Sequence, residues 1–226
     1  MISEEAVKKM YGISEVISMK IGIMGGTFDP IHNGHLHLAQ TALTQFDLDQ
    51  IWFMPNGMPP HKKQSSIESD IHERIAMTQI AIKANKQFYL QEYEAKREKV
   101  SYSYKTMEHF QKMYPDNEFY FIIGADSLFS IETWKHPERL FKACIILAAC
   151  RDEAATKESL NGQIRMLKAK YGAHIKFLAM PLEHVSSHEI RKLIESGEPV
   201  SEYIPAEVEA YIRKEGLYGS GNRKNQ

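Results

Sequence analysis

The chain has 226 residues, of which 43% are hydrophobic, and this is enough to bury one substantial core. Its 28 Lys and Arg residues nearly balance its 29 Asp and Glu residues, and the formal charge of -1 argues against the broad basic surface of a nucleic-acid-binding protein. No apolar run approaches the roughly 20 residues that cross a bilayer, and the first 18 residues lack the apolar core of a signal peptide. We therefore expect neither a nucleic acid nor a membrane as a partner.

Cysteine usage indicates the redox compartment. Cys144 and Cys150 match neither a CxxC pair nor the ligand spacing of a zinc site, which is typical of free thiols in a reducing compartment. A cytoplasmic protein is the expectation.

Short apolar segments alternate with longer amphipathic segments along the chain. The predicted strands cover residues 20–24, 51–55, 118–124, 143–150 and 174–180, and the predicted helices cover residues 35–46, 70–84, 103–114 and 157–171. The strands are apolar almost without interruption, as in a parallel sheet that is covered on both faces. This alternation predicts an α/β fold with right-handed crossovers and a doubly wound, mostly parallel, Rossmann-like sheet.

Four parts are expected. They are an N-terminal extension (1–18), the Rossmann-like domain (19–180), a small C-terminal helical subdomain that completes the binding site (181–218) and a tail (219–226). Residues 55–70 form the one long irregular segment, and long loops in compact domains are often functional. We expect residues 55–69 to act as a lid that closes over bound substrates.

The stretch GGTFDPIHNGH, residues 25–35, follows the first predicted strand directly, where open α/β sheets bind ligands. Gly25 and Gly26 let the backbone approach a ligand closely, and Asp29 with the proline after it favours a turn. Asn33 can cap a helix that begins near residue 34. The N-terminus of such a helix favours phosphate, although neither a P-loop nor a GxGxxG pattern is present.

Two histidines flank this predicted helix start. His32 and His35 lie on one side of the helix, so both imidazoles can donate to the same anion, whereas His37 is expected to be structural or solvated. The HxxH spacing is also half of a zinc site, but no HExxH pattern or cysteine partner accompanies it. We therefore favour a phosphate site, with His35 as its central residue.

The segment VSSHEIR, residues 185–191, supplies a second anion-binding candidate. Ser186 and Ser187 can cap a helix, and Arg191 falls about one turn inside it. Taken alone, this segment reads as an ordinary capped helix with a solvated arginine.

The stretch GTFDPIHNGH resembles the T/SFDPxHxGH signature of the nucleotidyltransferase family, and within it the bacterial nicotinate-nucleotide adenylyltransferase branch. Four further segments agree in order and spacing: WFMPNGMPPHK, SYS, FIIGADS followed by TW, and VSSHEIR. The resemblance covers residues 19–218 and implies a Rossmann-like nucleotidyltransferase fold. It also implies that the chain makes deamido-NAD and pyrophosphate from ATP and nicotinate mononucleotide. Magnesium is the expected cofactor, bound with ATP and with no protein ligand assigned.

The same resemblance implies a set of site residues. Those expected to bind ATP are Gly25, Gly26, Thr27, Phe28, His32, His35, Ser186, Ser187 and Arg191, with His32, His35 and Arg191 as the catalytic residues. Those expected to bind the mononucleotide are Asn56, His61, Lys62, Ser103, Asp126 and Trp134. The chain departs from the family at His188, where threonine is usual, and at residues 151–153, where Arg-Asp-Glu replaces the frequent Arg-Pro-Gly.

Several alternatives stay open. A sister adenylyltransferase would share the ATP half and act on nicotinamide mononucleotide or phosphopantetheine. A non-catalytic nucleotide-binding module is a second alternative, which the intact His32, His35 and Arg191 disfavour. An NAD-dependent dehydrogenase is a third, which the missing GxGxxG spacing disfavours. The sequence is also compatible with a homo-oligomer.

Overall fold

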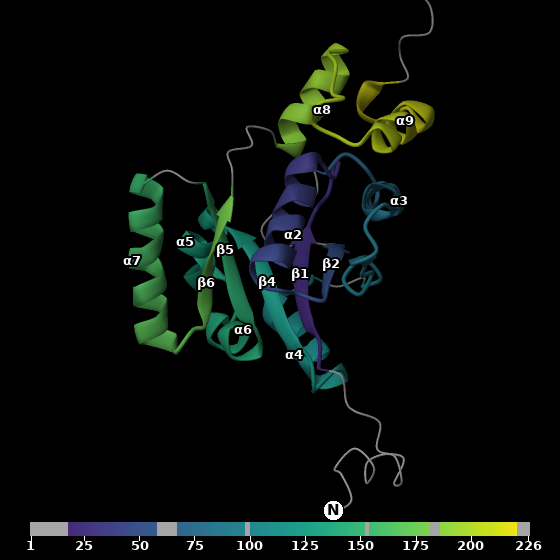
Figure 1. Ribbon diagram of the computed structural model, residues 1–226. Helices are drawn as coiled ribbons and strands as arrows, with labels where there is room; N and C mark the ends of the chain where they lie inside the picture. Colours follow the sequence, from purple (N-terminus) through teal and green to yellow (C-terminus); the bar gives the residue numbers. More distant parts are fainter. Residues whose placement is uncertain (1–17, 58–66, 98–99, 152–153, 181–185, 221–226) are drawn as a thin grey trace, which may run out of the picture.

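The structure is a computed structural model, and it describes residues 18–57, 67–97, 100–151, 154–180 and 186–220. Its strands are β1 (Lys20–Gly26), β2 (Gln50–Pro55), β3 (Phe88–Leu90), β4 (Glu118–Gly124), β5 (Ile145–Arg151) and β6 (Ile175–Met180). They form one sheet in the order β3-β2-β1-β4-β5-β6, and every neighbouring pair is parallel (Figure 1). The predicted doubly wound α/β fold is confirmed. The sequence prediction missed β3, which is three residues long.

Helices connect the strands. They are α2 (Asn33–Gln45), α3 (Ile71–Ile82), α4 (Ser103–Met113), α5 (Ala125–Ser130), α6 (Pro137–Ala143), α7 (Ala154–Tyr171), α8 (Ser187–Ser196) and α9 (Ala206–Glu215), with 3-10 turns η2 (Ile131–Thr133) and η3 (Leu217–Gly219). The short helices α5 and α6 were not predicted individually, because six or seven residues carry too little periodicity. Within the described ranges, none of these helices has the length and apolar content of a membrane span.

Each face of the sheet has its own apolar core. On one face, α2 and α3 pack with the C-terminal helices α8 and α9 against the inward residues of the strands. On the other face, helices α4 to α7 pack against the alternate residues of the same strands. Coverage on both faces explains why the strands are apolar almost without interruption.

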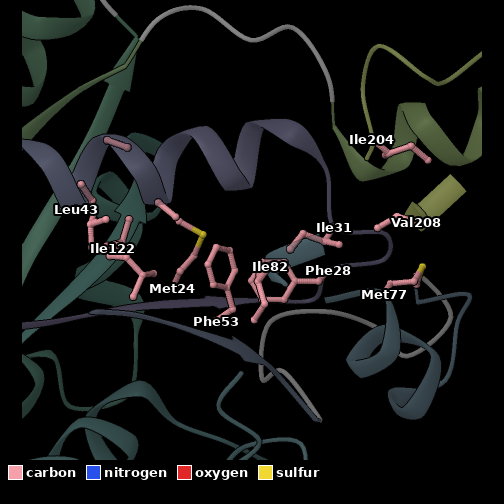
Figure 2. Packing of buried hydrophobic residues seen from close by; sticks show 14 of the residues in the cluster. Met24, Phe28, Ile31, Leu43, Phe53, Met77, Ile82, Ile122, Ile204 and Val208 are labelled. Carbon is pink, nitrogen blue, oxygen red and sulfur yellow. The ribbon is translucent and has the colours of Figure 1, made fainter. Parts of the chain in front are cut away.

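The C-terminal helices share their core with the loop between β1 and α2. Ile204 and Val208 belong to the same buried cluster as Phe28, Ile31 and Met77. Figure 2 shows Ile31 and Phe28 lying between the sheet residues and the two C-terminal side chains. The helices that close the chain therefore pack directly on the loop that was predicted to bind phosphate.

The strand order places a crevice beside β1. The chain runs outward from β1 through β2 to β3, and then returns to add β4 on the opposite side of β1. In open parallel sheets, ligands bind beyond the carboxyl ends of the strands at such a switch point. The loop that follows β1 is therefore the expected position of a ligand-binding site.

Candidate active site

The loop after β1 is shaped by one glycine and one strained residue. A methyl group built on Gly26 would lie 2.6 Å from the buried ring of Phe28, so no larger side chain fits there. Phe28 itself has a φ of 51°, a conformation that is rare for a bulky residue and costs free energy. Gly25 is exposed, and the nearest atom to a methyl group there would be 3.8 Å away. The space above Gly25 is therefore open to a ligand.

The two histidines lie against each other at the start of α2. Their ring centroids are 3.7 Å apart, and His32 is only 8% exposed. The backbone N–H of His32 donates to Nδ1 of His35 over 3.2 Å. Because this Nδ1 is an acceptor, the proton of the neutral His35 ring lies on Nε2, which is then a donor. The prediction that Asn33 caps the helix is wrong: His32 holds the cap position, and the Asn33 amide donates to the Glu202 carbonyl.

Asp29 ties this loop to the rest of the protein. Its carboxylate is 2% exposed and accepts from the backbone N–H groups of Glu68 (2.8 Å) and Ser69 (3.2 Å), and from the Tyr218 hydroxyl (2.7 Å). A carboxylate with three donors in a buried position is held firmly in place. Asp29 is therefore an anchor for the loop and does not face the open space above Gly25.

Helix α8 brings the second predicted anion-binding segment to the same loop. Ser186 caps the helix by accepting from the backbone N–H of Glu189, and Ser187 donates to the Pro30 carbonyl over 2.9 Å. Arg191 donates to the Asp29 carbonyl over 2.7 Å. The structure thus brings Ser187 and Arg191 together with the histidine loop, although 150 or more residues separate them in sequence.

Arg191 has an acidic partner as well. Its Nε donates to the Glu68 carboxylate over 2.6 Å, and its side chain is 10% exposed while that of Glu68 is 51% exposed. The guanidinium plane is therefore fixed between Asp29 and Glu68. His188, at the position where threonine is usual, is exposed.

Arg74 is a buried residue of this site that the sequence did not reveal. It is 2% exposed, and its guanidinium donates to the carbonyls of Thr27 (2.7 Å) and Asn56 (2.9 Å). Burial lowers the pKa of Arg74, while the nearby Asp29 carboxylate opposes that shift. One cation therefore joins the loops that follow β1 and β2.

A cavity of about 310 Å³ opens beside this loop. Its walls include the predicted residues Gly25, Gly26, Thr27, Asn56, Ser103 and Trp134. They also include residues for which the sequence predicts no individual role: Glu94, Ser101, Tyr102, Tyr104, Ser127, Lys135 and Leu140. The indole of Trp134 is half-buried and packs edge-on against Phe121. Such a wall offers an aromatic face to a flat ring, beside hydroxyl and amide groups.

Two polar atoms of the cavity wall are buried without a hydrogen bond to any described residue. Asn56 Oδ1 and Ser101 Oγ are buried and have no hydrogen-bond partner among the described residues, and buried polar atoms are rarely left so. Glu94 is also buried and accepts from the Thr106 hydroxyl over 2.6 Å. Burial raises the pKa of the Glu94 carboxyl.

Some predicted residues cannot be placed in this cavity. Asp126 lies in the first turn of α5 with its side chain exposed, and its neighbour Ser127 lines the wall instead. His61 and Lys62 lie outside the described residues, as does most of the expected lid. Residues 152–153, the second departure from the family pattern, also lie outside them.

The described residues do not form a metal cage of their own. Within the described ranges, no three His, Cys, Asp or Glu side chains gather in a way that would hold a metal ion. Asp29, the carboxylate nearest the histidines in sequence, already accepts three hydrogen bonds.

A glycine loop, a helix start with two imidazoles and an adjoining cavity at the switch point define a nucleotide-binding α/β protein. Comparison with known proteins makes the class more specific. The cytidylyltransferase-like family model matches residues 23–193, and the chain belongs to this family.

Individual relatives agree with this assignment. The chain is 40% identical over 202 residues to a protein of Clostridium kluyveri named probable nicotinate-nucleotide adenylyltransferase, with 88% of this chain and 99% of the relative covered. It is 41% identical over 199 residues to a protein of Clostridium tetani with the same name, covering 88% and 98%. The fold matches that of Plasmodium falciparum nicotinic acid mononucleotide adenylyltransferase complexed with NaAD, with a TM-score of 0.73, 22% identity, and 91% and 100% of the two chains covered.

Proposed function

We propose that this protein transfers the adenylyl group of ATP to nicotinate mononucleotide, giving deamido-NAD and pyrophosphate. The observation that carries the proposal is the convergence at one sheet edge of the His32–His35 pair, the Arg191 helix and the cavity beside Gly25. The names of the relatives that are 40% and 41% identical support the choice of acceptor.

The reaction needs little covalent help from the protein. A phosphate monoester has a second pKa near 6, so the mononucleotide phosphate is mostly a dianion at neutral pH and needs no protein base. One of its oxygens attacks the α-phosphorus of ATP, a new P–O bond forms, and the bond to the β-phosphate oxygen breaks so that pyrophosphate leaves. Alignment of the two reactants can supply about 7–11 kcal/mol of the required acceleration.

The residues of the loop and of α8 would stabilise the charge. The Nε2–H of His35, together with His32, would donate to the α-phosphate oxygens, since the tautomer of His35 leaves that donor on the outer side of its ring. Ser186, Ser187 and Arg191 would contact the β- and γ-phosphates. Mg²⁺ would arrive with ATP and neutralise part of the triphosphate charge.

The cavity would hold the acceptor. Trp134 would stack on the pyridine ring, with Ser103 beside it, and Asn56 would meet the acceptor through its buried amide. Roles for Asp126, His61 and Lys62 in this half, lid closure by residues 55–69, a cytoplasmic location and a homo-oligomer all stay predictions.

Pyrophosphate release from Mg-ATP tests the proposal, with nicotinate mononucleotide, nicotinamide mononucleotide and phosphopantetheine as parallel acceptors. We expect clear preference for the nicotinate form. In the His35→Ala variant kcat should fall by about 10²–10³, the usual loss for one donor to developing charge. The matched control is His37→Ala, because His37 is exposed on the same helix.

Each other result has a definite meaning. Preference for another acceptor would make the chain a sister adenylyltransferase. No turnover with any acceptor, together with binding of ATP, would make it a nucleotide-binding module. Equal activity of His35→Ala and His37→Ala would remove the role assigned to the histidine pair.

A further inference from the structure

Tyr218 is 189 residues from Asp29 in sequence, but its side chain contacts Asp29, which anchors the loop between β1 and α2. Its side chain is buried, and its hydroxyl lies 2.7 Å from the Asp29 carboxylate and 2.7 Å from the Ser69 hydroxyl. Tyr218 is the last residue of the expected C-terminal subdomain, and no local sequence pattern gives it a role. Its contacts join the end of the chain to the β1–α2 loop.

The backbone of Tyr218 is held in an unfavourable conformation to make these contacts. Its φ is 55° and its ψ is 35°, inside the turn η3, and left-handed values are uncommon for a large side chain. Such a conformation persists only where the surroundings fix it. Apolar packing alone would not require a hydroxyl at this point, so the polar contacts need their own explanation.

The direction of the hydrogen bonds is determined. A tyrosine hydroxyl has one proton, and the Ser69 hydroxyl donates to it, so the proton of Tyr218 goes to Asp29. Burial, followed by the nearby Asp29 charge, raises the pKa of Tyr218 and keeps this proton in place. The Asp29 carboxylate is therefore held by the Tyr218 hydroxyl as well as by the backbone N–H groups of Glu68 and Ser69.

The position of Asp29 affects the residues of α8 that are expected to bind phosphate. The Asp29 carbonyl accepts from Arg191, and the next carbonyl, that of Pro30, accepts from Ser187. A rotation of Asp29 would move both carbonyls and release the guanidinium and the hydroxyl that rest on them. His32 follows Pro30 by two residues, so it would also shift.

We infer that Tyr218 is a positioning residue for the ATP half of the site: its hydroxyl fixes Asp29, and through the carbonyls of residues 29 and 30 it orients Arg191 and Ser187 before ATP binds. This inference rests on the proposed function for its kinetic readout, and its binding readout does not.

The test compares the wild type with Tyr218→Phe, which keeps the ring and removes the hydroxyl. We expect the Kd and the KM for Mg-ATP to rise by about fivefold to tenfold, because a hydrogen bond to a charged group is lost and the Ser69 hydroxyl compensates only in part. The KM for nicotinate mononucleotide should change less than about twofold, since none of the Tyr218 contacts reaches the cavity wall. Tyr211→Phe is the control, because Tyr211 lies on the neighbouring helix α9 and outside this network.

A loss that is equal for both substrates, or an unchanged Kd for Mg-ATP, overturns the inference. Calorimetric binding of Mg-ATP needs no acceptor, so it tests Tyr218 even if the enzyme proves inactive with nicotinate mononucleotide. If Tyr218→Phe fails to fold, Ser69→Ala serves instead, because it removes the donor that directs the Tyr218 proton to Asp29. It should give the same split between the two substrates at smaller size, and an even loss again refutes the inference.

Discussion

Arg74→Met tests whether one buried cation joins the loops that form the site. The guanidinium makes two charge-assisted hydrogen bonds, at 2.7 Å to the Thr27 carbonyl and 2.9 Å to the Asn56 carbonyl. Each bond of this kind contributes about 1.5–3 kcal/mol, so losing both costs about 3–6 kcal/mol. Methionine fills a similar volume and removes a desolvated charge, which offsets part of the loss and leaves about 2–4 kcal/mol of destabilisation.

Thermal and urea unfolding measure this change. For a chain of this size, each kcal/mol lowers the melting temperature by about 2–4 °C, so we expect a fall of about 5–15 °C. Because Thr27 and Asn56 both line the cavity, the KM values for both substrates should also rise. The control is Arg165→Met, at an exposed position on α7, which should change the free energy of unfolding by less than about 0.5 kcal/mol. If Arg74→Met matches this control, the two carbonyls do not depend on Arg74 and the reasoning is wrong.

Three smaller predictions concern the glycines and the buried acid of the cavity. Gly57→Ala should destabilise the fold by about 1–3 kcal/mol in urea unfolding, because the added methyl group would lie 2.7 Å from the Glu94 carbonyl. The control is Gly124→Ala, whose methyl group would have no atom within 4 Å and should change the free energy of unfolding by less than about 1 kcal/mol. Equal effects of the two substitutions would contradict this reasoning. Gly25→Ala should leave the melting temperature nearly unchanged, because its methyl group would meet Met54 and Phe121 only at ordinary contact distances of 3.8 Å. It should raise the KM for ATP by about tenfold or more, because the methyl group would project where ATP is proposed to approach; a normal KM would show that ATP does not approach there. Because the pKa of Glu94 is raised in the folded state, its contribution to stability is full below the ordinary value of 4.5 and is lost as pH rises through the folded-state pKa. Glu94→Gln keeps an acceptor for Thr106 and should flatten this fall when the urea midpoint is measured against pH. Parallel pH curves for the two proteins would refute this prediction.

The sheet was predictable because its signal is local. Strands covered on both faces must be apolar throughout, and five such runs identified β1, β2, β4, β5 and β6. The edge strand β3 carries no comparable run: Phe88 and Leu90 are half-buried and Tyr89 is exposed. Its three residues become a strand only by pairing with β2, and a single sequence does not show that pairing.

The proximity of candidate site residues was predictable where those residues are contiguous in sequence. The glycines, the turn and the histidines of residues 25–35 contact residues that are close in sequence, as the hydrogen bond between His32 and His35 shows. Arg74 lies 47 residues from Thr27, and the helical pattern around it does not distinguish it from a solvent-exposed arginine. Tyr218 lies 189 residues from Asp29 and resembles an aromatic residue at a helix end. Their roles depend on long-range contacts, which no local pattern encodes.

The FDP part of the signature has a structural role that differs from the role of its histidines. The Asp29 carboxylate accepts from two backbone N–H groups and from Tyr218, and it is almost fully buried, so it does not reach a substrate as a base. The carbonyls of Asp29 and Pro30 accept hydrogen bonds from Arg191 and Ser187 of α8. The signature therefore has two parts: the imidazoles proposed to bind phosphate, and the backbone carbonyls on which a distant helix docks. A change at Asp29 should consequently disturb Ser187 and Arg191 of α8 as well as the histidine loop, because the Asp29 carboxylate also lies 3.7 Å from the Arg191 guanidinium.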